Sequence, residues 1–277
     1  MQVHRHLFER IISKENLFTA WEEFRKGKQG RKDVQEFERK LEQNLFRLHR
    51  GLVAGTYRHQ PYSAFIICDP KQRRIHKATV RDRILHHAVF TVLNPIFEPA
   101  FIAHSFSCRK GKGTHKAVDA LDRMLRSVSR NGTRPCFGLK CDIHQFFASV
   151  DHDILLGILE KRLKDEKTIA LLLPIRSFLK EHLHLDLHPH KVTLRKYRQG
   201  IDFLGYVLLP HHRVLRTKAR RRIVRKLGER ITAHKAGLLT EESVEQSLQS
   251  YLGVLSHANC YRLSQDFQNQ CWFLLQE

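Results

Sequence analysis

The spacing of apolar residues predicts helices between residues 16 and 55, with a loop near Gly30. Apolar side chains recur there at intervals of three and four positions, which places them on one helix face. These are Val34, Phe37, Leu41, Leu45 and Leu48. We expect this face to be buried in the core of the protein.

A β-type segment from Tyr57 to Cys68 follows, and residues 69–74 predict a hairpin turn that leads into Ile75. Residues 81–93 predict the next helix. We expect Asn94-Pro95 and Glu98-Pro99 to stop this helix, because the residue before a proline disfavours helical backbone angles.

The second half of the chain predicts helices and short strands in turn. A helix starts at Thr114, a strand covers residues 136–141, and two helices cover residues 153–164 and 168–183. Residues 213–235 predict a longer helix. Its apolar positions recur every four residues and form one seam, made of Ile223, Leu227 and Ile231.

Composition adds a large positive charge to this picture. The 277 residues include 49 Lys and Arg against 28 Asp and Glu, a formal net charge of +21. Such an excess attracts polyanions, so nucleic acid is the first expected partner and an anionic membrane the second. No apolar run is long enough to span a bilayer, and the N-terminus has no signal-peptide pattern. Because the six cysteines lack metal-ligand spacing, we expect reduced thiols and a cytoplasmic protein.

The predicted helix over residues 213–235 concentrates this charge, with ten basic residues and one acid, Glu229. So many like charges repel one another unless a polyanion lies nearby. We therefore expect it to contact nucleic acid through Arg216, Lys218, Arg220, Arg221, Arg222 and Arg225. A basic amphipathic helix can also lie on a membrane, but this one has no Trp or Phe to anchor it there.

A second basic run lies between residues 71 and 83, where six cations accompany one acid, Asp82. Arginine offers paired donors to phosphate oxygens and lysine a compact charge. The spacing by itself favours a solvated basic turn. Residues 107–113 carry Arg109 and two glycines that would let the backbone approach a phosphate, although one such glycine pair is a weak signal.

The segment with the most specific chemistry is CFGLKCDIHQFFASVD, residues 136–151. Its strand leads to Asp142, and Phe146 and Phe147 follow four and five positions later. This arrangement resembles motif A of reverse transcriptases.

Other segments resemble the same family in the same order. Residues 69–118 are similar to the fingers of bacterial reverse transcriptases of the group II intron, retron and diversity-generating type. LHLDLHPHK, residues 183–191, is similar to their motif D. GIDFLGY, residues 200–206, is similar to their primer grip, motif E. A basic helix then stands where the thumb of such enzymes lies.

The resemblance implies an α+β right-hand polymerase fold. Its expected parts are a helical region over residues 1–56, fingers over 57–135, a shortened palm over 136–207 and a helical thumb over 208–277. The implied function is that of an RNA-directed DNA polymerase by descent. Its implied partners are an RNA template and primer, or an RNA–DNA duplex, together with dNTP.

The resemblance also assigns roles to single residues. Asp142 would bind the catalytic Mg²⁺, Ile143 would add a backbone carbonyl, and Phe147 would lie under the incoming sugar. The triphosphate would be contacted by a basic set, made of Lys71, Arg73, Arg109 and Lys191. The primer would be held by Phe203, Leu204 and Gly205.

One part of the family pattern is missing. Such enzymes carry a motif B helix and a motif C hairpin with a Tyr-x-Asp-Asp sequence between motifs A and D, yet no two Asp residues are adjacent here. Only 61 positions separate Asp142 from Phe203, and the predicted elements fill them. The pattern indicates a deletion with its join between Leu171 and Phe178.

The deletion leads us to expect no activity from this chain alone. Two-metal phosphoryl transfer needs carboxylates from separate segments, and Asp142 is a single one. Two alternatives to a polymerase stay open: a non-catalytic RNA-binding module derived from one, and a fragment that folds with a partner supplying the missing strands. The motif A strand must leave an exposed sheet edge or find a new partner strand. An exposed edge would favour self-association or poor solubility at low salt.

Overall fold

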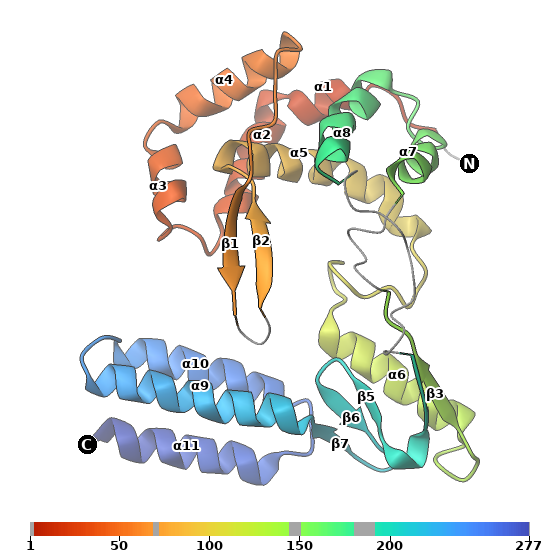
Figure 1. Ribbon diagram of the computed structural model, residues 1–277, viewed down its shortest axis with the longest axis vertical. Coiled ribbons are helices and arrows are strands. Elements are labelled where there is room, and N and C mark those ends of the chain that lie inside the picture. Colours follow the sequence, from red (N-terminus) through yellow and green to blue (C-terminus); the bar gives the residue numbers. More distant parts are fainter. Residues whose placement is uncertain (1–2, 69–71, 144–150, 180–191, 277) are drawn as a thin grey trace. The chain divides into compact units, whose positions relative to one another are not determined.

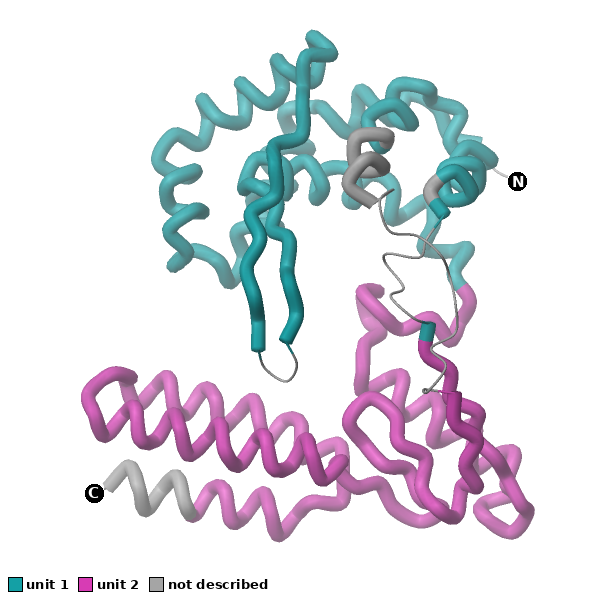
Figure 2. The backbone as a smooth tube through the Cα atoms, viewed as in Figure 1, with its two compact units in different colours: residues 1–101, 143–186 teal, residues 102–142, 187–277 magenta. Residues whose placement is uncertain are grey.

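The computed structural model describes residues 3–68, 72–143, 151–179 and 192–276. The chain divides into two compact units, residues 1–101 with 143–186 as unit 1 and residues 102–142 with 187–277 as unit 2 (Figure 2). Helices dominate and small antiparallel sheets accompany them (Figure 1). The expected α+β class is therefore confirmed. No described helix is long and apolar enough to cross a bilayer.

The N-terminal part of unit 1 follows the predicted apolar spacing but breaks into separate helices. These are α1 (Leu7–Ile12), α2 (Lys14–Arg25), α3 (Lys32–Glu38) and α4 (Leu41–Val53). The Ser13 hydroxyl caps α2 by accepting from the Asn16 N–H at 3.2 Å. The expected apolar face is buried or half-buried, and it packs with Trp21 in one core.

Helix α5 (Val80–Phe97) extends past Asn94-Pro95, so the first expected stop is wrong, and it ends just before the second, Glu98-Pro99. Proline removes one backbone hydrogen bond and usually ends a helix. Here the last turn places Ile96 and Phe97 against the core, and the Glu98 N–H still bonds to the Asn94 carbonyl. Burial of this turn offsets the missing bond, and a short 3-10 helix, η1 (Glu98–Ala100), completes the element.

The predicted hairpin is present as β1 (Ser63–Ile67) and β2 (Arg73–Lys77), with Phe65 opposite Ile75. Residues 69–71, at its turn, lie outside the described residues. Both strands are largely exposed, so the hairpin adds little to the core of unit 1.

The helices predicted over residues 153–164 and 168–183 are α7 (His152–Glu160) and α8 (Glu166–Leu179), although 180–191 lie outside the described residues. Asp151 caps α7, because its side chain accepts from the N–H groups of Asp153 at 2.9 Å and Ile154 at 3.0 Å.

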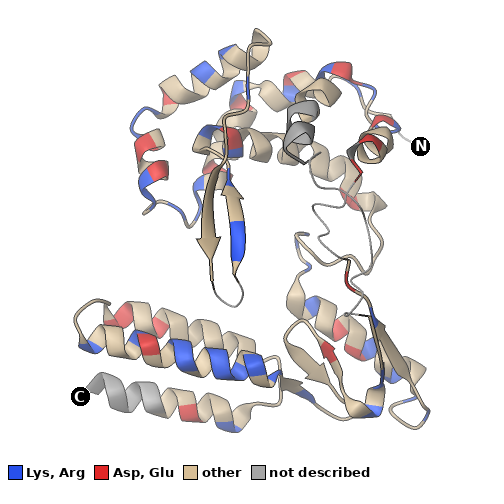
Figure 3. Cartoon of the chain, in the orientation of Figure 1, with Lys and Arg blue, Asp and Glu red and all other residues tan. Residues whose placement is uncertain are grey.

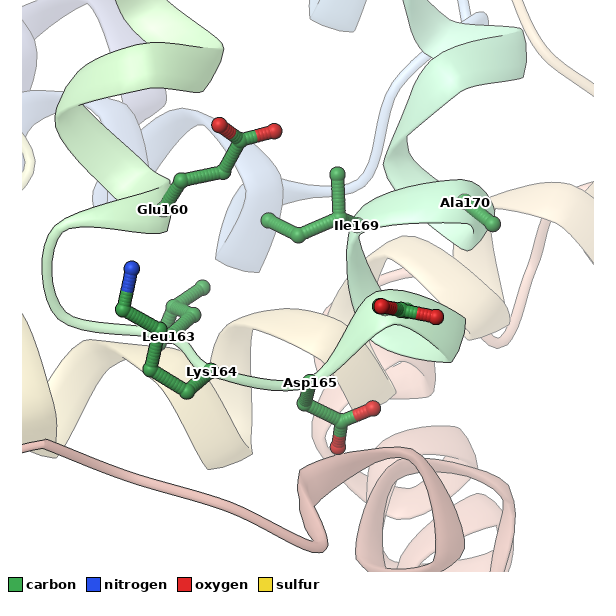
Figure 4. A pocket seen from close by; sticks show the side chains of 7 residues that line it. Glu160, Leu163, Lys164, Asp165, Ile169 and Ala170 are labelled. Atoms are coloured by element: carbon green, nitrogen blue, oxygen red, sulfur yellow. The ribbon is translucent and has the colours of Figure 1, made fainter.

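Asp165 joins two helices of unit 1, as Figure 4 shows beside a pocket of that unit. Its carboxylate accepts from the N–H groups of Leu7 at 2.6 Å and Phe8 at 3.0 Å, at the start of α1. It also accepts from the Thr168 N–H at 3.2 Å, at the start of α8. Burial acts to raise the pKa of Asp165, but these donors outweigh it and hold the pKa below its ordinary value. Ionised Asp165 therefore stabilises unit 1.

Asp165→Ala is expected to destabilise unit 1 by about 1 kcal/mol at pH 7, the usual effect of losing a helix cap. Because the folded pKa lies below the unfolded value of about 3.9, the stabilisation is complete above that value and is lost as the pH falls through the folded pKa. The difference in the free energy of unfolding between variant and parent, measured by urea unfolding, should therefore narrow from pH 5 toward pH 2.

The control for this prediction is Glu160→Gln, which removes another exposed charge beside the same pocket. Its unfolding midpoint should match that of the parent. An Asp165→Ala protein as stable as the parent at pH 7 would show that the carboxylate contributes nothing.

Unit 2 begins with α6 (Thr114–Val128), at the predicted residue. Strand β3 (Phe137–Lys140) pairs with β4 (Thr193–Lys196). A second sheet follows the 3-10 helix η4 (Tyr197–Gln199) and consists of β5 (Ile201–Phe203), β6 (Tyr206–Leu208) and β7 (Arg213–Leu215). The chain then forms three helices, α9 (Thr217–Lys235), α10 (Glu241–Leu255) and α11 (Tyr261–Gln276). These elements share a core that includes Val118, Tyr206, Ile223 and Val244.

The β3–β4 sheet is covered on one face only. A Cβ added at Gly138 would lie 2.9 Å from the Ile201 side chain, so this face packs closely on β5. On the other face, Leu139 and its cross-strand partner Leu194 are each 66% exposed. Among the described residues, β3 has β4 as its partner strand and a second edge without one. The new pairing expected for this strand is therefore present, and one edge stays open.

Candidate functional site

Helix α9 is apolar on one side and basic on the other, as its sequence predicts. Ile223, Leu227 and Ile231 are buried in the core of unit 2. Figure 3 shows Lys and Arg gathered along the first half of the helix, and the exposed ones are Lys218, Arg220, Arg221, Arg222 and Arg225. Arg225 bonds to Glu229 one turn later. Within the described part of the chain, Arg220, Arg221 and Arg222 form no ion pair.

The acidic side chains of unit 2 are used at the base of this helix instead. Arg213 pairs with Asp119 at 2.8 Å and lies 3.6 Å from Asp122, both on α6. Arg216, the residue before α9, pairs with Asp202 of β5. These contacts fix the start of α9 on the sheet. They leave Arg220, Arg221 and Arg222 exposed and, among the described residues, without an ion-pair partner. Of the predicted nucleic-acid contacts, Arg216 is thus half-buried and structural.

The residues predicted to grip a primer form a tight turn beside this base. Phe203 and Tyr206 pair across β5 and β6, and Leu204 and Gly205 connect them with φ angles of 47° and 94°. Two positive φ values are typical of a type I′ hairpin turn. A leucine rarely adopts this conformation, and Leu204 is 47% exposed at the tip. Strain of this kind is frequent where a loop contacts a ligand.

The predicted catalytic residues come from the segment after β3. Asp142 lies two residues beyond the strand and is exposed, as is Ile143. Phe147, Lys71 and Lys191, predicted to contact the nucleotide, lie outside the described residues.

The described residues do not fit a catalytic magnesium centre. Among them, no group of three or more His, Cys, Asp or Glu side chains could hold a metal ion. A two-metal site needs several carboxylates around both cations, and Asp142 is an exposed one at a strand end.

The basic run between residues 71 and 83 is less open than its sequence suggests. Asp33 of α3 accepts from Arg83 at 2.6 Å and from Lys77 at 2.8 Å. Arg81 is held by Asp82 at 2.9 Å. Arg73 is exposed on β2 and, within the residues that the structure describes, forms no ion pair. The sequence did not predict that Asp33 binds these cations, because no local pattern links it to Arg83, which lies 50 positions away.

Arg109, also predicted to contact phosphate, supports its own loop. One of its guanidinium nitrogens donates to the carbonyl oxygens of Ile102 and Ser105, both at 3.0 Å. The loop lies in unit 2 and leads to Gly113, where α6 begins. This side chain therefore has a structural role in the loop before α6.

Comparisons with known proteins bear on the origin of these features. No protein-family model matches the chain. A stretch of 163 residues is 29% identical to the group II intron-encoded protein LtrA of Lactococcus lactis subsp. cremoris, covering 58% of this chain and 26% of that protein. The chain is a distant homologue of group II intron-encoded proteins. It spans about a quarter of the length of this relative.

Two further relatives match shorter parts. Nuclear intron maturase 1, mitochondrial, of Arabidopsis thaliana is 28% identical over 92 residues, which cover 33% of this chain and 12% of that protein. Protein YkfC of Escherichia coli strain K12 is 27% identical over 129 residues, or 45% of this chain and 33% of that protein. The expected relationship to the reverse transcriptases of group II introns is thus supported as distant homology to intron-encoded proteins.

Proposed function

We propose that this homologue of group II intron-encoded proteins is a nucleic-acid-binding derivative of a reverse transcriptase, and that it holds RNA or an RNA–DNA duplex along α9. The observation that carries the proposal is the uncompensated row Arg220, Arg221 and Arg222 on a helix whose other side is buried. Exposed arginines of this density bind phosphates by releasing counterions. Two relatives named for introns favour RNA as the polyanion.

We further propose that the chain keeps parts of a polymerase hand. The fingers would be β1–β2 with Arg73, and the shortened palm would be β3 with Asp142. The primer grip would be the Leu204-Gly205 turn, and the thumb would be α9–α11. The hand would position nucleic acid without adding nucleotides, because the described residues give Asp142 no set of companion ligands.

A second candidate function is an RNA-directed DNA polymerase that is completed by a segment from elsewhere. It is favoured by β3, whose second edge has no partner strand among the described residues and whose apolar face is exposed. An open edge of this kind is a template for pairing with another strand. Under this reading the chain self-associates or binds a partner through that edge.

Replacing Arg220, Arg221 and Arg222 with Ala is expected to flatten the salt dependence of binding. Each phosphate contact contributes roughly 0.9 to the slope of log K against log salt on duplex DNA and roughly 0.7 on single strands. Three lost contacts should lower the slope by about 2 to 3 on these values. Fluorescence anisotropy with a labelled RNA–DNA duplex at several salt concentrations gives the slope.

A matched control removes three exposed cations from unit 1, with Arg31→Ala, Arg39→Ala and Lys40→Ala combined. The control changes the net charge equally, so its slope should stay close to that of the parent. If the α9 triple variant and the control give the same slope, α9 is not part of the binding surface.

A further inference from the structure

Two adjoining pockets of unit 1 gather basic and aromatic side chains and no carboxylate. The first has a volume of ≈ 390 Å³, and its cationic lining is Arg47, Arg58 and Arg81. The second has a volume of ≈ 400 Å³ and is lined by Phe8, Leu52, Val53 and Lys167 among others. Tyr57 and Arg58 line both pockets, so the basic hollow and the apolar one meet at this pair.

The cations around these pockets are largely uncompensated. Arg81 is paired with Asp82, and it also donates to the Arg58 carbonyl at 2.5 Å. In the described ranges of the chain, Arg47, Arg58 and Lys167 form no ion pair, and all three are exposed. They come from three separate segments: α4, the chain before β1, and α8. Like charges brought together by the fold favour an anion in the space between them.

The apolar lining adds a second requirement on the ligand. Phe8 and Tyr57 offer aromatic surface beside the basic pocket, and Arg81 lies 5.0 Å from the Tyr57 ring centroid. Single-stranded nucleic acid has this combination, because its phosphates follow basic grooves while its unpaired bases contact aromatic side chains. A duplex keeps its bases stacked and paired, so it has none to place in the second pocket.

We propose that these pockets bind a stretch of single-stranded RNA, with one phosphate among Arg47, Arg58 and Arg81, a neighbouring phosphate at Lys167, and an unpaired base beside Phe8 and Tyr57. This inference rests on the proposed function, because it takes RNA as the ligand of the protein. It adds a second contact surface, built by unit 1 alone, to the one on α9. Pockets that bind small ligands usually have volumes of roughly 300 to 1,000 Å³. Both pockets lie within this range.

The test combines Arg47→Ala, Arg58→Ala and Lys167→Ala in the full chain, with a fluorescein-labelled single-stranded RNA 12-mer as the probe. Each phosphate contact on single strands contributes roughly 0.7 to the salt slope, so the pocket variant should lower it by about 2. The matched control is Arg39→Ala, Arg50→Ala and Lys161→Ala, which removes three exposed cations of unit 1 that line neither pocket. Circular dichroism should show the same helix content in all variants.

Photocrosslinking supplies a readout that overall charge does not move. RNA carrying 4-thiouridine should crosslink to the tryptic peptide that contains Tyr57. This peptide covers residues 51–58 in the parent and residues 51–71 in the pocket variant, because Arg58→Ala removes a cleavage site. The crosslink should persist when Arg220, Arg221 and Arg222 are Ala, because unit 1 does not depend on α9. It should be lost in the pocket variant.

The inference and the proposed function fail in different ways. A pocket variant that matches its control in slope and keeps the crosslink overturns the inference alone. An unchanged slope in the α9 variant overturns only the proposal that α9 contacts nucleic acid. If the pocket variant loses binding to phosphatidylserine vesicles and keeps its binding to RNA, the pockets serve a membrane surface, and the RNA assignment is wrong.

Discussion

Primer extension by this chain alone is expected to stay at background on RNA and DNA templates with Mg²⁺ or Mn²⁺. A graft that restores a segment from motif B to motif C is expected to give the chain primer-extension activity. One exposed carboxylate, Asp142, leaves both metal ions short of ligands and the reacting oxygens unclamped. The graft would supply the missing Asp pair and a strand for the open edge of β3. Incorporation of labelled dNTP measures the gain, and size-exclusion chromatography should show a monomer.

The site of the graft follows from the packing of α8. The expected join, between Leu171 and Phe178, falls inside this continuous helix. Ile169, Leu171 and Leu172 pack against the core of unit 1, so an insertion after Leu172 keeps the part of the helix that stabilises the unit.

Two substitutions control this experiment. Asp142→Ala in the graft, and separately the loss of the grafted Asp pair, should each return incorporation to background. Activity of the ungrafted parent that Asp142→Ala abolishes would contradict the prediction. A graft that folds, binds primer and template and adds no nucleotide would show that other parts of the site have also decayed, and RNA binding would then be the better account.

Asp82→Ala is expected to destabilise unit 1 by about 3 kcal/mol, because it removes a fully buried carboxylate and leaves the hydrogen-bond donors around it without an acceptor. Asp82 is fully buried at the start of α5. Its carboxylate accepts from the Tyr57 hydroxyl at 2.9 Å, the Gln60 N–H at 3.1 Å and the Thr79 hydroxyl at 2.7 Å, in addition to Arg81. Burial acts to raise its pKa, but the bonds from Thr79 and Arg81 outweigh this and hold the pKa of Asp82 below its usual range.

Urea unfolding followed by Trp21 fluorescence measures this loss. The chain has two tryptophans, so Trp272→Phe leaves the fully buried Trp21 of unit 1 as the reporter. Asp33→Ala is the matched control. Asp33 is likewise an ion-paired carboxylate of unit 1, but its side chain is 34% exposed, whereas that of Asp82 is buried. Partly exposed pairs contribute about 1 kcal/mol or less. Equal losses in the two variants would show that burial of Asp82 has no special weight.

Local pattern predicted most of the helices, and it failed where packing outweighed a local rule. The apolar spacing located α6 at Thr114 and the seam of α9 correctly, because helix periodicity is a property of neighbouring residues. The stop at Asn94-Pro95 failed because Ile96 and Phe97 gain more from burial in the core than the helix loses at the proline. Nothing near Pro95 in the sequence carries that information.

The candidate site likewise has features that the sequence predicts and features that only packing explains. The exposed arginines of α9 could be predicted, because a helix with a buried seam must turn its remaining residues to solvent. The ion pairs of Lys77 and Arg83 could not, since their partner Asp33 lies on another helix. The sequence likewise gave no sign that Arg47, Arg58 and Lys167 gather around two pockets.

By itself the sequence determined the strong basic character, the order of helices and strands, the position of the basic helix and the distant relationship to intron-encoded proteins. Each of these depends on composition, on near neighbours or on motif order. Only the tertiary structure decided which charges are compensated, which strand pairs with β3, and where cations meet an apolar hollow. Those outcomes join residues as distant as Leu7 and Asp165, which are 158 positions apart, and packing alone brings such residues together.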